Sequence, residues 1–149
     1  MVFNESFANC TTLNSKAYWF KGCSTLTVIE NIGNLKTNNV TAMNEMFRDC
    51  SSLVSLDLSS LNSEKVSYMD LMFYSCYNLA NLNIRSFNTS NVLSMGSMFF
   101  GCYALTNLDL CNFNTEKVGD MSNMFGQCGQ LPVLDLSGFD TQNVKFMYG

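Results

Sequence analysis

The chain has 149 residues, a formal net charge of −4, 47% apolar residues and 13% charged residues. This length suits one domain with one core, and the apolar content is enough to offset the entropy lost on folding. The acidic net charge and the lack of clustered Lys and Arg argue against nucleic-acid binding. The lack of histidine argues against His-dependent catalysis and His-containing metal sites. No apolar stretch is long enough for a membrane span.

Residues 1–19 read as an irregular partial repeat, with an abbreviated unit beginning at Phe7 and Cys10. The opening MVFNESFANC has neither the basic region nor the apolar region of a signal peptide. Tyr18 and Trp19 stand just before the first full repeat. The single Trp is expected to cap the core there, although a contact with a partner is the alternative.

Residues 20–149 carry about five tandem repeats, and the last of them is truncated. The repeats begin at Phe20, Phe47, Phe73, Phe99 and Phe125. The first has 27 residues and the others follow a 26-residue pattern, F-x-x-C-x-x-L-x-x-L-[DN]-[LI]-x-x-[FL]-[ND]-[ST]-x-x-V-x-x-M-x-x-M. Apart from Met1, every methionine falls in the last two apolar slots of this pattern. Such a fixed period is typical of solenoid proteins.

Each repeat predicts a short strand followed by a short helical segment. Leu56-Asp57-Leu58 alternates between apolar and polar residues, as in a half-buried strand. The Asn or Asp and the Ser or Thr that follow are residues that cap helix starts. Apolar residues at Val118, Met121, Met124 and Phe125 would lie on one helical face. We therefore expect an α/β, leucine-rich-repeat-like solenoid with one parallel strand and one short helix in each repeat.

The motifs F-x-x-C-x-x-L-x-x-L-D-L-S and N-T-x-x-V-x-x-M-x-x-M-F resemble those of the BspA-type leucine-rich repeat surface proteins over about residues 20–149. The resemblance implies adhesion, binding of host or matrix proteins, or assembly with other proteins, at the cell surface or outside the cell. It implies no catalytic residues and no cofactor. The chain begins and stops in mid-repeat, so neither end is expected to be capped, and end-to-end contacts through the terminal repeats are predicted.

Two sets of polar residues recur in register along the repeats. Four cysteines share one slot, and a Cys between Phe and Leu favours a buried thiol over a disulfide or a metal ligand. Those cysteines are Cys50, Cys76, Cys102 and Cys128. Cys111 stands in a different slot and is expected to point outward. Asp57, Asp109 and Asp135 share the slot after the strand leucine, where they form an acidic stripe that could instead hold calcium or attract a basic partner.

Aromatic residues cluster at slots that the repeat leaves variable. In two neighbouring repeats these slots hold Tyr74, Tyr77, Phe100 and Tyr103, whereas other repeats have Arg, Ser or Gly there. The rings either stack from one repeat to the next or form an interface with a partner, because aromatic anchors carry much of the binding energy of interfaces. Together with Asp57, Asp109 and Asp135 they are the candidate interface residues.

These observations favour a non-catalytic protein-interaction module of the adhesion or recognition type. A structural or scaffolding subunit within a larger assembly is the alternative, in an intracellular or organellar compartment. An enzyme is not expected, because no nucleophile, base and pocket converge in the pattern.

Overall fold

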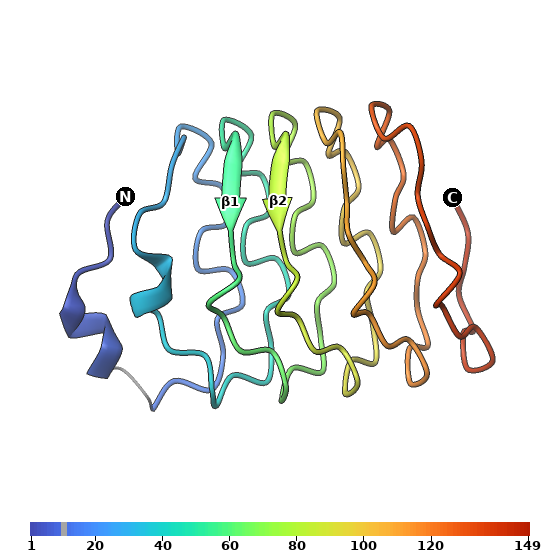
Figure 1. The fold of residues 1–149 in the computed structure, drawn as a ribbon, viewed down its shortest axis with the longest axis horizontal. Coiled ribbons are helices and arrows are strands. Elements are labelled where there is room, and N and C mark those ends of the chain that lie inside the picture. Colours follow the sequence, from blue (N-terminus) through green and yellow to red (C-terminus); the bar gives the residue numbers. More distant parts are fainter. Residues whose placement is uncertain (10–11) are drawn as a thin grey trace.

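The computed structural model describes residues 1–9 and 12–149, wound into coils that stack side by side, with the two termini at opposite ends of the stack (Figure 1). Each coil takes up about one repeat, because the backbone hydrogen bonds between coils join residues 25 to 29 positions apart, such as Phe47 N–H to the Met72 carbonyl at 2.9 Å. The helices and strands are short: η1 (Glu5–Asn9), η2 (Ile32–Asn34), β1 (Ser55–Asp57) and β2 (Asn81–Asn83). Both helices are 3-10 helices.

The strands lie on one side of the coils, which we call the strand side. β1 and β2 pair in parallel, with Leu56 opposite Leu82. Leu56 is 3% exposed, whereas Asp57 beside it faces solvent. A strand was expected in each repeat, but the corresponding residues 107–109 and 133–135 form none. The pattern therefore predicts the position of the strand but not its backbone pairing.

The helical segment predicted after each strand is wrong: these residues form turns on the side opposite the strands. Leu71 and Ser75 adopt left-handed backbone conformations, with φ of 55° and 59°, and donate their N–H groups to the next coil. Alternate N–H groups close turns within the coil instead, such as Met72 N–H to the Met69 carbonyl at 3.3 Å. Apolar residues three apart thus come from successive three-residue turns, which imitate the spacing of a helix.

The core is a stack of side chains from equivalent slots. The five repeat-initial Phe rings stack nearly parallel, with neighbouring centroids 5.0 to 5.7 Å apart. The cysteine that follows each ring is buried or half-buried. In the four repeats from Phe47 onward its thiol donates to the Phe carbonyl of the preceding coil, as from Cys76 Sγ to Phe47 O at 3.1 Å. A Cys is therefore suited to this slot because it is a small apolar residue with one weak donor.

The Ser or Thr after the strand has a different role from the helix cap that was predicted. Thr89 Oγ1 accepts the Asn114 N–H at 2.7 Å and donates to the Asn114 carbonyl at 2.9 Å in the next coil. Thr115 does the same with Asp140, at 2.8 Å for both bonds. Both hydroxyl-bearing residues are buried. We call these paired bonds the hydroxyl ties, since each fastens one coil to the next.

The two ends of the stack differ. At the N-terminal end Phe3 is 3% exposed and packs against Phe7, Trp19 and Phe20, so aromatic rings cover the first coil. This end is therefore not open, contrary to the expectation from the sequence, and Trp19 lies where a capping residue would. In the last coil, by contrast, side chains in core slots face solvent, with Leu136 at 37% and Met147 at 62% exposed.

Candidate interaction surfaces

The four predicted aromatic residues form two stacked pairs on one edge of the coils. Tyr74 and Phe100 have ring centroids 5.1 Å apart and are partly buried, while Tyr77 and Tyr103 have centroids 5.6 Å apart. Tyr77 and Tyr103 are each 45% exposed. The inner pair therefore serves packing between coils, whereas the outer pair is half exposed to solvent, with the Tyr103 hydroxyl donating to Gln127 Oε1 at 2.5 Å.

Charged and glycine residues border this aromatic patch. The Arg48 guanidinium lies 5.1 Å from the Tyr74 ring centroid and is paired with Glu45 at 2.9 Å. On the other side the Phe100 ring leans over Gly126, where an added Cβ would lie 2.7 Å from Phe100 Cδ2. The sequence alone did not point to Arg48, although its position in the Tyr74 slot one repeat earlier is a signal that could have done so.

The three predicted aspartates do not converge on one point; each turns the chain after its own strand position. Asp57 accepts the Ser59 N–H at 2.9 Å, Asp109 the Cys111 N–H at 3.1 Å and Asp135 the Ser137 N–H at 2.9 Å. The backbone N–H of Ser59 lowers the pKa of Asp57, and hydrogen bonds from Ser137 lower that of Asp135. Across residues 1–9 and 12–149 no cluster of three His, Cys, Asp or Glu residues could hold a metal ion.

The cysteines divide into buried and exposed thiols. Burial raises the pKa of Cys50 to about 12 and that of Cys128 to about 11, so both stay protonated at neutral pH. The prediction that Cys111 points outward is confirmed, and the Asp109 carboxylate raises the pKa of its thiol. All six cysteines that the structure describes are free. Cys10 lies outside the described residues.

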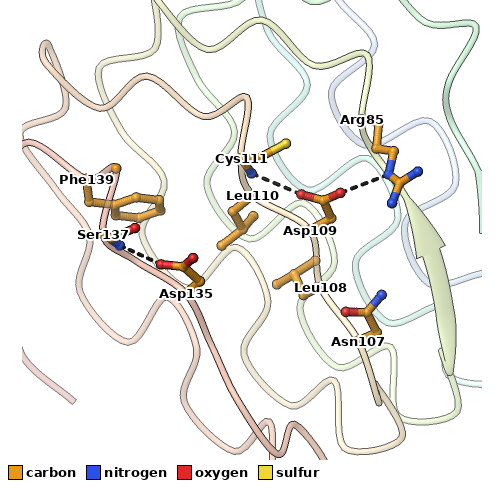
Figure 2. Close-up of a pocket in the computed structure, with 10 residues that line it drawn as sticks. Arg85, Asn107, Leu108, Asp109, Leu110, Cys111, Asp135, Ser137 and Phe139 are labelled. Atoms are coloured by element: carbon orange, nitrogen blue, oxygen red, sulfur yellow. Dashed lines mark hydrogen bonds and ion pairs between the residues drawn. The ribbon is translucent and has the colours of Figure 1, made fainter.

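A groove lies on the strand side between the last two coils and was not predicted from the sequence. It has a volume of about 420 Å³ and is lined by residues 107–111 of one coil and by Asp135 and residues 137–139 of the next, with Arg85 at its rim. Figure 2 shows Leu108 and Leu110 between the two coils and Asp135, Ser137 and Phe139 on the facing coil. We call this feature the strand-side groove. It brings Asp109 and Asp135 to the two walls of one hollow, whereas Asp57 lies on β1, outside it.

The Arg85 guanidinium crosses from the neighbouring coil to Asp109, with Nε 2.9 Å from Oδ2 (Figure 2). This ion pair occupies one wall of the strand-side groove and neutralises Asp109. Asp135 on the opposite wall has no ion pair within the described part of the chain, so the groove carries one uncompensated carboxylate. Among the described residues, no helix is long and apolar enough to cross a membrane.

The stacked coils, each built from about one repeat, define the class of a tandem-repeat protein (Figure 1). The family model described as "Mycoplasma protein of unknown function, DUF285" matches residues 4–106 and again residues 77–149. The chain belongs to this family. The overlap of the two matches falls inside the repeats, as expected when one repeat pattern can be aligned in more than one register. Comparisons with curated proteins and with solved structures gave no match.

Proposed function

We propose that this chain is a leucine-rich-repeat-like solenoid of the BspA type and serves as a non-catalytic protein-interaction module of the cell-surface adhesion or recognition type. The observation that carries this proposal is the outer aromatic pair. Tyr77 and Tyr103 are 45% exposed each and occupy slots that other repeats fill with Ser or Gly. The core thus does not require rings there, and tyrosines held on a stacked backbone are effective anchors for a partner.

Hydrogen bonding between the coils supports a binding role because it holds the patch in a fixed shape before a partner arrives. The Ser75 N–H donates to the Phe100 carbonyl at 2.8 Å, and Gly101 N–H donates to the Gly126 carbonyl at 2.9 Å, directly beneath the rings. A preformed surface loses little conformational entropy on binding. The absence of histidine from the whole sequence supports the non-catalytic part of the proposal.

The test compares Tyr77→Ser/Tyr103→Ser with Leu93→Ser, which removes a side chain of equal exposure, 44%, outside the patch. The probe is an immobilised extracellular-matrix protein preparation, and binding is followed by biolayer interferometry. We expect saturable binding by the unmodified protein, a loss of about tenfold or more in the double variant and little change in the control. Equal binding by the double variant, or none by the unmodified protein, contradicts the proposal.

A thermal unfolding curve for each variant separates recognition from stability. The outer pair is half exposed, so Tyr77→Ser/Tyr103→Ser is expected to stay folded with a modest fall in Tm. If it unfolds instead, the outer rings are structural, as the inner Tyr74 and Phe100 are.

The second candidate function is that of a structural subunit within an assembly, and the last coil favours it. Val133 is 77% exposed and Met147 is 62% exposed, which makes this coil an apolar surface that a partner or another copy could cover. Light scattering on the purified chain tests this function. Association that is weakened by Met147→Lys supports it, and a monomer at all accessible concentrations contradicts it.

A further inference from the structure

We propose that the strand-side groove binds an extended segment of a partner protein that carries an apolar side chain next to a Lys or Arg. As in the proposed function, the partner is a protein, but it would bind here at a surface separate from the aromatic patch. The two proposals can therefore fail independently. Three observations carry it: the groove is held open, its floor is apolar, and one wall has a carboxylate that forms no ion pair within the described residues.

The groove is held open because the two coils are fastened on both sides of it. On one side the Thr115 hydroxyl tie grips Asp140, and on the other the Cys128 thiol donates to the Phe99 carbonyl at 3.1 Å. Between these ties, no backbone hydrogen bond joins residues 129–139 to the preceding coil in this fully described stretch. At the equivalent place in the stack, by contrast, the backbones of β1 and β2 are paired in parallel.

The floor of the groove suits an apolar side chain with a peptide backbone beside it. Leu108 and Leu110 line it with 7% and 6% of their surface exposed, and Phe139 closes it from the other coil (Figure 2). Leu58 in the paired region donates its N–H to the Asn83 carbonyl at 2.9 Å, but the equivalent bond from Leu110 to Asp135 is not formed between these described residues. A purely apolar ligand would bury these two polar groups without partners, whereas peptide amides can satisfy them.

The wall of the groove that carries Asp135 favours a positively charged side chain next to the apolar side chain of the bound segment. Asp109 is already paired with Arg85, whereas the Asp135 carboxylate accepts hydrogen bonds from the backbone and side chain of Ser137 and forms no ion pair within the described residues, so it keeps lone pairs for a donor from a ligand. A Lys or Arg next to the apolar anchor would bring its charge to Asp135. The net charge of the chain, −4, adds a weak attraction for such a segment.

The experiment uses the isotopically labelled 149-residue chain and a panel of capped eight-residue peptides. Each peptide has a Thr- and Val-rich extended sequence with Leu, Ile, Phe or Tyr before a central Lys, and a matched version has Glu in place of the Lys. Backbone amide shifts are followed by NMR. We expect saturable shifts at residues 107–111 and 135–139 with Lys peptides, and weaker ones with Glu peptides. No response to the whole panel, or shifts confined to other residues, overturns the proposal.

Two pairs of variants test the location of the site. A Cβ at Gly138 or at Gly129 meets nothing within 4 Å, so Phe fits at both, but only Gly138 lines the groove. Gly138→Phe should therefore block peptide binding, while Gly129→Phe should leave it unchanged. Asp135→Asn should weaken the Lys peptides by up to about fivefold, as for an exposed ion pair, and Asp57→Asn should not. Unchanged binding in Gly138→Phe overturns the proposal, as does equal affinity for Lys and Glu peptides.

Discussion

The coils around β1 and β2 and the last two coils share one repeat pattern but differ on the strand side. In the first region the backbones pair in register, and in the second they are separated by a groove. The opposite side is alike in both regions, with isolated parallel bridges from Ala42 to Tyr68 and onward to Phe146. The comparison shows that the turns, the core rings and the hydroxyl ties hold the stack together, and that strand pairing is an addition that the stack can lose.

The largest expected effect comes from removing a core ring in each region. Phe73 is fully buried between Phe47 and Phe99, at 5.7 and 5.6 Å, so Phe73→Ala should cost about 3–5 kcal/mol of unfolding free energy. Phe125 is half-buried and, among the described residues, stacks on Phe99 alone, so Phe125→Ala should cost clearly less. Urea unfolding monitored by circular dichroism measures both. Equal losses would show that the last coil is as tightly packed as the centre.

Removal of a hydroxyl tie is expected to have a medium effect on the unfolding free energy. Thr89→Val leaves the Asn114 N–H and carbonyl without their partner, and Thr115→Val does the same for Asp140. Each should cost about 1–3 kcal/mol, because a partly buried polar group loses its hydrogen bonds.

Hydrogen exchange separates the two Thr variants. Thr115→Val should also speed amide exchange throughout residues 125–149, since this tie and the Cys128 thiol are the fastenings that flank the groove. If faster exchange is confined to the Asp140 amide, the Thr115 hydroxyl tie does not hold the groove in place. Ser in place of either Thr is the matched control, because Ser63 makes the same pair of bonds with Asn88.

The amino-acid pattern predicted which residues form the core, because burial repeats with the sequence: Val92, Met95 and Met98 are all fully buried. The pattern did not predict the backbone conformation between these residues. Apolar residues three apart fit a helix and a series of turns equally well, and only the left-handed residues, such as Leu71, distinguish the two. Nothing in the residue type of Leu71 signals that conformation, because it is stabilised by hydrogen bonds to the next coil.

Individual candidate residues were predicted better than their arrangement. Tyr77 and Tyr103 could be singled out because they interrupt slots of small residues, and both are exposed. The strand-side groove could not be predicted, because Asp109 and Asp135 stand in the same sequence pattern as Asp57. Whether two neighbouring coils pair or separate depends on the relative position of their backbones, which the pattern does not encode.

The smallest expected effect concerns pH and the aspartate turns. The Ser59 N–H holds the pKa of Asp57 below its ordinary value near 4, so the charged form is favoured in the folded protein. This stabilisation is present above the unfolded pKa and is lost as pH falls through the folded pKa, below about 4. Because Asp57 is exposed, its share is at most a few tenths of a kcal/mol. Asn83 makes the same turn without a charge, accepting the Arg85 N–H at 3.3 Å. Asp57→Asn should therefore keep the fold and slightly reduce the fall of the urea-unfolding midpoint between pH 5 and pH 2. If the variant instead loses stability at pH 7, the paired strands require the charge of Asp57 and not only the turn that it makes.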